Sequence, residues 1–267
     1  MNSGVTPDSL QIRGLHVAVR HGDPARTPLL LMNGIGARLE ALQPFVDALD
    51  PAIPVIRFDA PGVGGSRPSR APYRFPALAR RLAHVLDELG HRRVDVLGIS
   101  WGGGLAQQFA FSQRRRCRRL VLVATGTGSV MVPASPRVLR HMVTPRRYRD
   151  PDYLLRWAGE LYGGTARRDP GRLEGLMHQR IPTGYTRQLA AGAGWTSLPI
   201  LPLITQPTLV LAGDDDPIIP LLNSRILRSL IPHAQRHVYA GGHLELVADP
   251  PLLVPVVEKF LAEGAAR

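Results

Sequence analysis

Ser100 stands in the run Gly98-Ile99-Ser100-Trp101-Gly102, between an apolar segment and a segment with helical periodicity. A G-x-S-x-G pattern between a strand and a helix is typical of a tight turn that presents a serine hydroxyl as a nucleophile. Such a turn brings the positions two before and two after the serine close together, so side chains there would clash and glycine is favoured. The alternative is an ordinary helix N-cap serine in a glycine-rich turn. The strand and helix around the motif favour the nucleophile.

A serine hydroxyl attacks poorly until a base takes its proton, so a histidine must come within hydrogen-bond reach. His243, in "YAGGHLELV", follows the last predicted strand on a glycine-rich loop that can carry an imidazole back over the sheet edge. We therefore predict that His243 is the base. Structural or surface roles are expected for the other histidines, His16, His21, His84, His91, His141, His178, His233 and His237.

The base needs a carboxylate that fixes its tautomer and stabilises its protonated form. Asp214, Asp215 and Asp216 follow the strand "TLVLAG", and Pro217 comes next. Because a proline biases the preceding residue to extended backbone, Asp216 is the predicted acid. Asp214 and Asp215 are expected to be turn or solvated residues and remain the alternatives for this role.

Acyl transfer also needs two backbone N–H groups directed at the oxyanion of the intermediate. The amide of Trp101, directly after the serine and at the positive end of the helix dipole, is one candidate. The second is the amide of Ile35, in the loop of "LLLMNGIGA". Asn33-Gly34 also reads as a simple turn, which is compatible with this role.

The elements that position these residues alternate along the chain. Apolar runs bounded by turn residues predict strands at residues 15–20, 28–34, 54–62, 94–100, 120–125, 208–214 and 236–242. Helical patterns cover residues 37–50, 75–90, 103–113, 221–230 and 252–264. This alternation predicts an α/β fold, with a mostly parallel sheet and helices on both of its faces.

The alternation stops between residues 127 and 205, which are too many for a plain loop. We predict a mainly helical cap over 127–205, inserted into a core formed by 1–126 and 206–267. Such a cap would sit over the carboxyl ends of the strands, where open sheets bind ligands. Its aromatic residues are expected mainly to pack within the cap, with a substrate channel as the alternative.

Composition limits the classes of protein that remain. The net charge of +12 comes almost entirely from arginine, with a cluster at Arg114, Arg115, Arg116, Arg118 and Arg119. A nucleic-acid patch is the minor alternative, because no recognition motif accompanies the charge and cations suit a helix C-terminus. Steering of acidic substrates also stays open. The single cysteine, Cys117, excludes an intrachain disulfide, and the absence of an export pattern or transmembrane run leads us to expect a cytoplasmic protein.

Two glycine-rich stretches, 61–68 and one near residue 126, faintly resemble phosphate-binding loops. Neither has the lysine of the nucleotide motif, so both are interpreted as turns. Asp59, in "RFDAPGVGGS", is expected to order its loop rather than to take part in chemistry.

With the serine turn, the acid and the late histidine in that chain order, the sequence resembles the α/β-hydrolases over nearly its full length. The resemblance implies an eight-stranded sheet and a lid, with Ser100, Asp216 and His243 at the triad positions. "NGIG" departs from the frequent His-Gly of the oxyanion loop, which leaves open how Asn33 orders it.

Within that group the chain is most similar to intracellular poly(3-hydroxyalkanoate) depolymerases. The similarity rests on "NGIGA", "FDAPGVGGS", "PYRFP", "SWGGGLAQQFA", "VMVP", "PRRY", "YGG", "RRDP", "GWTSL" and "LAGDDDPIIP". It implies a serine esterase acting on medium-chain-length polyester or another hydrophobic ester, with the storage-granule surface as a place of action, without metal or organic cofactor and without nucleic acid. Alternatives on the same fold are a carboxylesterase, a cofactor-free haloperoxidase or perhydrolase, a 3-hydroxyacyl transacylase and a non-catalytic binding domain.

Overall fold

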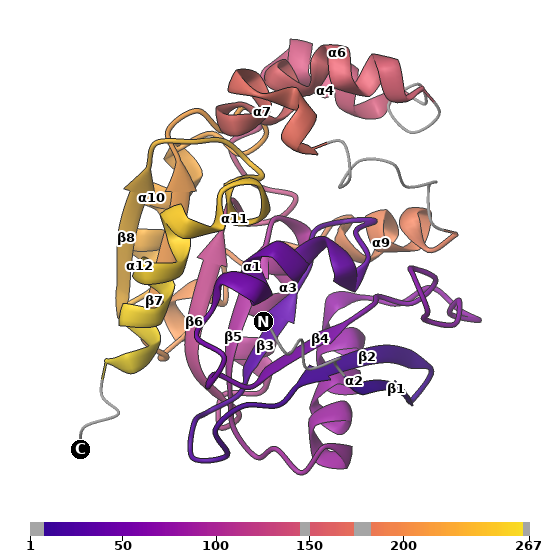
Figure 1. The fold of residues 1–267 in the computed structure, drawn as a ribbon, viewed down its shortest axis with the longest axis vertical. Helices are drawn as coiled ribbons and strands as arrows, with labels where there is room; N and C mark the ends of the chain where they lie inside the picture. Colours follow the sequence, from indigo (N-terminus) through magenta and orange to yellow (C-terminus); the bar gives the residue numbers. More distant parts are fainter. Residues whose placement is uncertain (1–7, 145–149, 174–182, 264–267) are drawn as a thin grey trace, which may run out of the picture.

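A single eight-stranded sheet forms the centre of the computed structural model, which describes residues 8–144, 150–173 and 183–263 (Figure 1). The strands are β1 (Asp8–Ile12), β2 (Leu15–Arg20), β3 (Leu29–Met32), β4 (Val55–Phe58), β5 (Val94–Ile99), β6 (Cys117–Val123), β7 (Thr208–Gly213) and β8 (Ala234–Tyr239). Their order is β1-β2-β4-β3-β5-β6-β7-β8. The β1–β2 and β2–β4 pairs are antiparallel, and the other pairs are parallel. The predicted fold class is confirmed.

Sequence patterns failed mainly at the two edges of the sheet. Strand β1 has four exposed residues out of five, so it has no apolar run to reveal it. It pairs with β2 through the two-residue turn Arg13-Gly14, where both residues have positive φ, as in a type I′ hairpin. At the other edge, β8 begins at Ala234 rather than at residue 236, and its four central residues are exposed.

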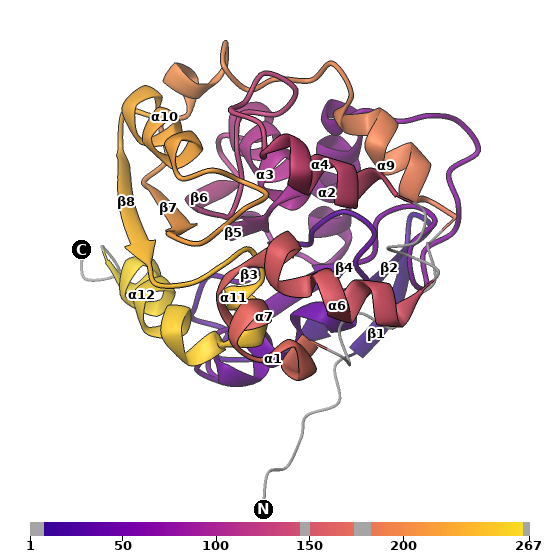
Figure 2. The same cartoon turned by 90° about the horizontal axis from the view of Figure 1, so that it is seen from above.

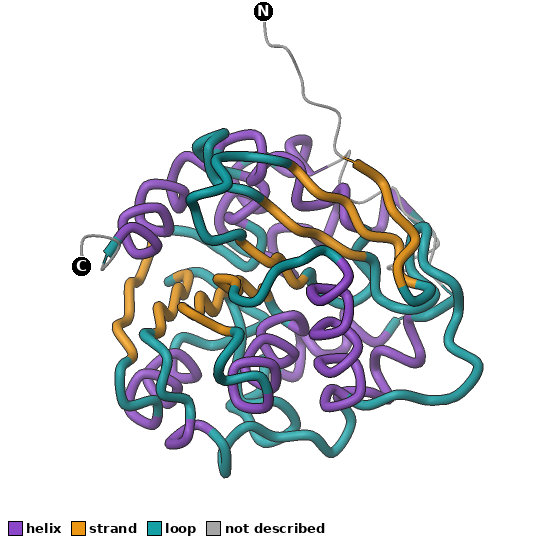
Figure 3. Tube along the Cα trace, turned by 90° about the horizontal axis from the view of Figure 1, so that it is seen from below, coloured by secondary structure: helices purple, strands orange, loops and turns teal. Residues whose placement is uncertain are grey.

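Helices cover both faces of the sheet, as Figure 3 shows from below. The helices of the core are α1 (Gln43–Ala48), α2 (Phe75–Glu88), α3 (Trp101–Ser112), α10 (Leu222–Leu230), α11 (Glu245–Ala248) and α12 (Pro250–Ala262), with the 3-10 helix η1 (Leu39–Leu42). Helices α2, α3 and α10 contribute to one buried cluster, and α1, α11 and α12 to the other. Both faces of the central strands are therefore buried, which explains their continuous apolar runs.

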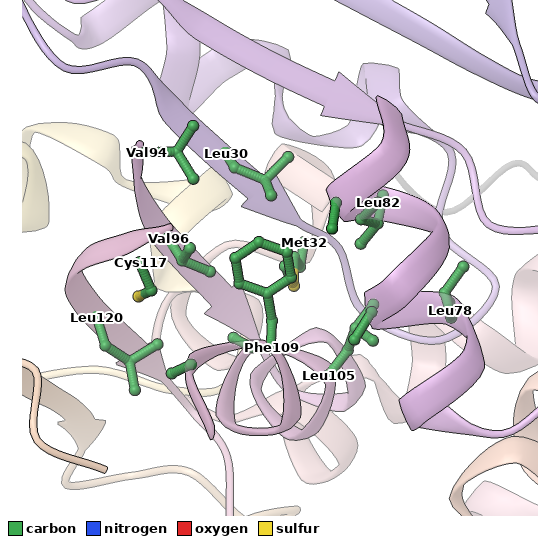
Figure 4. Packing of buried hydrophobic residues seen from close by; sticks show 14 of the residues in the cluster. Leu30, Met32, Leu78, Leu82, Val94, Val96, Leu105, Phe109, Cys117 and Leu120 are labelled. Atoms are coloured by element: carbon green, nitrogen blue, oxygen red, sulfur yellow. The ribbon is translucent and has the colours of Figure 1, made fainter. Parts of the chain in front are cut away.

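The packing of one face is visible in Figure 4, where Phe109 of α3 lies among Val96 of β5, Met32 of β3 and Leu105 of its own helix. Phe109, Val96 and Met32 are all completely buried. This packing holds the start of α3 against the end of β5, the junction at which Ser100 lies.

Between β6 and β7 the chain forms the helices α4 (Pro136–Val143), α6 (Pro151–Tyr162), α7 (Gly164–Arg168) and α9 (Tyr185–Gly192), with the 3-10 helices η2 (Pro170–Leu173) and η3 (Leu201–Leu203). Helices α4, α6 and α7 lie above the sheet (Figures 1 and 2), and they share an apolar cluster with Ile218, which follows β7. All of α4, α6, α7 and α9 fall inside the segment predicted to be a cap. The quoted "PRRY" and His178 lie outside the described residues.

Candidate active site

The turn between β5 and α3 holds Ser100 in a conformation that few residues other than glycine adopt, with φ 54° and ψ −120°. A backbone held in such a region costs on the order of 1–3 kcal/mol, so the surroundings must fix it. The Ser100 amide donates to Val123 O at 2.9 Å, and the Ser100 carbonyl accepts from Thr125 Oγ1 at 2.7 Å. The end of β6 therefore holds the turn that presents the hydroxyl.

The two glycines of the motif are required by close backbone contacts. A Cβ on Gly98 would lie 2.3 Å from the carbonyl oxygen of Gly102. A Cβ on Gly102 would lie 2.1 Å from the carbonyl oxygen of Met32. No side chain fits at either distance, which confirms the steric reason given for glycine at these two positions.

Ser100, His243 and Asp216 form one chain of contacts. His243 Nε2 lies 3.1 Å from Ser100 Oγ, and His243 Nδ1 lies 2.9 Å from Asp216 Oδ2. The other carboxylate oxygen of Asp216 accepts the amides of Ile218 and Ile219, each at 2.9 Å. These donors fix the carboxylate, which in turn orients the imidazole toward the serine. Proton transfer from a serine hydroxyl requires this arrangement.

The three consecutive aspartates have three different partners. Asp214 Oδ1 accepts the amide of Gly241 at 2.9 Å and so ties the loop after β7 to the loop after β8. Asp215 accepts the amide of Gly164 and a bidentate pair of bonds from Arg167. Only Asp216, of the three, contacts His243. Asp214 and Asp215 are turn residues, as predicted, and each also has a specific partner.

The loop after β3 lies beside the serine, since a Cβ on Gly34 would lie 3.8 Å from Ser100 Cβ. Asn33 orders this loop: its Oδ1 accepts the amide of Gly34 at 2.8 Å, and its Nδ2 donates to Arg38 O at 2.7 Å. The Ile35 amide has no acceptor among the described residues. Trp101 is the first residue of α3, and the first amides of a helix have no acceptor within the helix. Both predicted donors are therefore available to a ligand.

Gln188, on α9, is a residue of this site that the sequence did not reveal. It is 1% exposed, its Oε1 accepts the amide of Gly36 at 2.8 Å, and its carbonyl accepts Trp101 Nε1 at 2.9 Å. Gln188 thus links the loop of Ile35 to the residue after the serine. No local pattern marks it, because its partners lie far away in the sequence.

A buried tyrosine supports the loop that carries His243. Tyr239, at the end of β8, donates from its hydroxyl to Gly242 O at 3.1 Å. Burial raises the pKa of Tyr239, and the nearby carboxylates of Asp216, Glu245 and Asp214 raise it further. The phenol therefore stays protonated, and it remains a donor at any ordinary pH.

The remaining candidates have structural roles. Asp59 is completely buried and accepts the amides of Leu39 and Gly65, each at 2.8 Å, together with His16 Nδ1 at 2.9 Å. It orders the glycine-rich loop, as expected. Among the described residues, no three side chains of the His, Cys, Asp or Glu type are placed to hold a metal ion.

Comparisons with known proteins agree with this geometry. Residues 27–249 match the model of the α/β-hydrolase fold family. The chain is 51% identical over 97% of its length to a poly(3-hydroxyalkanoate) depolymerase of Ectopseudomonas oleovorans, 92% of which is covered. It is 32% identical over 79% of its length to a 2-hydroxymuconate semialdehyde hydrolase of Pseudomonas putida, 78% of which is covered.

A solved structure of a hydrolase from Pseudomonas aeruginosa PA01 superimposes with a TM-score of 0.78, at 26% identity, and covers 98% of this chain and 100% of that one. The resemblance found in the sequence is thereby confirmed. The order of the strands, the turn at Ser100 and the matching family model lead to one conclusion: this chain belongs to the α/β-hydrolase family.

Proposed function

We propose that this protein is a serine esterase that hydrolyses poly(3-hydroxyalkanoate), of the medium-chain-length type, to 3-hydroxy acids. The observation that carries the proposal is the unbroken contact chain from Ser100 Oγ through His243 to Asp216, in a sequence 51% identical to a protein named for this activity.

Each group in this chain of contacts has a role in the proposed reaction. Ser100 Oγ attacks the carbonyl carbon of the ester while His243 Nε2 takes its proton, and Asp216 stabilises the imidazolium. The amides of Ile35 and Trp101 donate to the oxyanion of the tetrahedral intermediate. The bond to the alcohol oxygen then breaks, and His243 gives the proton to that oxygen. A water molecule, deprotonated by His243, attacks the carbonyl carbon of the acyl-enzyme. The bond from that carbon to Ser100 Oγ then breaks, His243 returns the proton to Oγ, and the acid is released.

We assign the segment 127–205 to a cap over this site. In support, α4, α6 and α7 share an apolar cluster that also contains Ile218 of the core, and α9 reaches the serine turn through Gln188. Trp195 packs edge-on against Phe75, with ring centroids 4.8 Å apart, and Trp157 stacks on His141. These two aromatics therefore pack against other rings of the protein, as expected for most aromatics of this segment.

We also propose that the protein works in the cytoplasm, at the surface of stored polyester granules. None of the helices in the described ranges combines the length and apolarity that a bilayer span demands. Sedimentation of granules from cells that store the polyester tests this location: the protein should pellet with the granules and stay in the supernatant of cells without polymer.

Incubation of the purified protein with dispersed short-chain and medium-chain polyesters, beside a series of soluble p-nitrophenyl esters, tests the reaction. We expect 3-hydroxy acids from the medium-chain polymer and covalent labelling of Ser100 by a fluorophosphonate. The variant Ser100→Ala should lose both while keeping its fold. Hydrolysis of the soluble esters alone would indicate a general carboxylesterase. A wild-type protein that neither hydrolyses nor is labelled would be a non-catalytic binding domain.

A further inference from the structure

A tight turn of the cap lies against both loops that carry the acid and the base. This turn, Tyr162–Thr165, joins α6 to α7, and Tyr162 O accepts the amide of His243 itself at 2.7 Å. On the other side, the amide of Gly164 donates to Asp215 Oδ2 at 2.7 Å. The turn is therefore hydrogen-bonded to the backbone of the base and to the neighbour of the acid.

Three glycines let the backbones meet. Gly163 and Gly164 have φ of +65° and +47°, and a Cβ on Gly163 would lie 1.7 Å from Asp215 O. A Cβ on Gly164 would lie 2.1 Å from the amide nitrogen of Gly242, and one on Gly242 would lie 2.1 Å from Tyr162 O. These contacts are between main-chain atoms, so a side chain cannot be accommodated by a change of rotamer.

Glu245, a residue of the core, accepts hydrogen bonds from both segments that meet in this contact. Its side chain is 1% exposed, and its Oε1 accepts the amides of Thr165 at 2.6 Å and of Gly242 at 3.0 Å. The guanidinium of Arg168 lies 3.5 Å from the same oxygen. Its Oε2 is buried and has no hydrogen-bond partner among the described residues. When the donors of a buried carboxylate move away, the free energy of their hydrogen bonds to the charge is lost. This cost opposes any displacement of the turn from the loop of His243.

We propose that Glu245 is a positioning residue, which fixes His243 by fastening the Tyr162–Thr165 turn of the cap to the amide just before the base. The proposal rests on the triad assigned above. It also means that this end of the cap stays in place during turnover, and that any opening of the cap occurs elsewhere. Because a misplacement of about 1 Å can cost about 10²-fold in rate, loosening of this contact should appear in kcat.

The test compares Glu245→Leu with Glu245→Gln in hydrolysis of a small soluble ester. Leucine has a similar volume but accepts no hydrogen bond, so both amides lose their acceptor. Glutamine keeps Oε1 as an acceptor for both amides, while it removes the charge that faces Arg168 and replaces the oxygen without a partner by an NH2 group. We expect Glu245→Leu to lower kcat about tenfold or more with KM unchanged, and Glu245→Gln to restore most of kcat. The control is Asp169→Asn, which changes an exposed carboxylate at the end of α7. This variant should change neither kcat nor KM.

Arg168→Ala perturbs the same contact from the cap side by removing an exposed guanidinium 3.5 Å from Glu245 Oε1, and it keeps the test decisive if Glu245→Leu fails to fold. It should also lower kcat rather than raise KM. The double variant Glu245→Leu/Arg168→Ala should be no slower than the slower single variant, because both break one contact. A folded Glu245→Leu with the wild-type kcat would overturn the proposal, as would equal losses in Glu245→Leu and Glu245→Gln. A wild-type protein without esterase activity would instead refute the proposed function.

Discussion

At the scale of single residues, the run Asp214-Asp215-Asp216 shows that neighbours of one chemical type have different roles. Asp214 binds the loop of the base, Asp215 binds the cap, and Asp216 binds His243. Because Pro217 biases Asp216 toward extended backbone, the third carboxylate can leave the turn and reach His243. Substitution of each aspartate in turn tests these three roles in solution.

Asp216→Asn should lower kcat on a soluble ester by about 10⁴-fold, because an amide favours the wrong tautomer of His243 and cannot stabilise the imidazolium. KM should change little. The control is Asp214→Asn, which keeps a carbonyl oxygen for the Gly241 amide and should stay within several-fold of the wild type. Steady-state kinetics of both variants decide the assignment, and a large loss in Asp214→Asn alone would move the acid to that position.

Gly102→Ala should destabilise the protein, because the new Cβ would lie 2.1 Å from Met32 O and 2.5 Å from Asn33 O. Overpacking against backbone costs about 1–3 kcal/mol of unfolding free energy. Urea unfolding followed by circular dichroism measures it. Gly171→Ala is the comparison, since its Cβ meets its nearest neighbour at an ordinary 3.4 Å. Equal stabilities of the two variants would contradict the steric argument.

At the scale of elements, the segment between β6 and β7, which we propose is a cap, contacts the loops of the candidate site. Helix α9 holds the loop after β3 through Gln188, and the turn between α6 and α7 holds the loop after β8. The core therefore does not fix the predicted oxyanion donors by itself. Substitutions in the cap should affect the rate of the chemical step as well as the choice of substrate.

Gln188→Met removes the acceptor of the Gly36 amide while keeping the length of the side chain. We expect a lower kcat at unchanged KM. The loss should be smaller than the roughly 10²–10³-fold that follows removal of a whole oxyanion donor, because the Ile35 amide is displaced and not deleted. Gln188→Glu keeps an acceptor and should recover most of the activity. A rise in KM without a change in kcat would show that Gln188 contacts substrate instead.

At the scale of the whole molecule, part of the arginine excess has a structural explanation. Arg116 pairs with Asp87, Arg118 donates to Asp95 at 2.8 Å, and Arg119 lies over the ring of Phe260. Burial raises the pKa of Asp95, and Arg118 opposes this shift. Arg116 thus ties the start of β6 to α2, Arg118 ties β6 to β5, and Arg119 ties β6 to α12. These contacts support the structural interpretation of the cluster over a nucleic-acid patch.

Cys117 reports on the integrity of the whole sheet. It begins β6, it is 2% exposed, and burial raises the pKa of its thiol. Because the thiolate is the reactive form, native protein at pH 8 should react with a disulfide reagent only as fast as the sheet opens. Absorbance of the released thiolate measures this rate, and unfolded protein should react at once and with one equivalent. The raised pKa also means that ionisation of Cys117 in the unfolded state lowers stability as the pH rises above about 8.5.

Local chemistry let the sequence determine much of this protein. The tight turn at Ser100 requires glycine on both sides, the buried strands require apolar runs, and the order of serine, acid and histidine is characteristic of this fold. Strand β1 escaped prediction because a hairpin edge with exposed side chains has no apolar pattern. Its place was set by pairing with β2, which is a contact between segments and not a property of either one.

Only the tertiary structure decided which distant groups hold the site in place. Gln188 meets Gly36, and Glu245 meets Thr165, across 152 and 80 residues of chain. Nothing local in the sequence marks such pairs, because a buried acceptor is defined by the donor that arrives from another element. The sequence thus pointed to the groups that we propose do the chemistry, and the packing of the segment between β6 and β7 on the core decided how they are held.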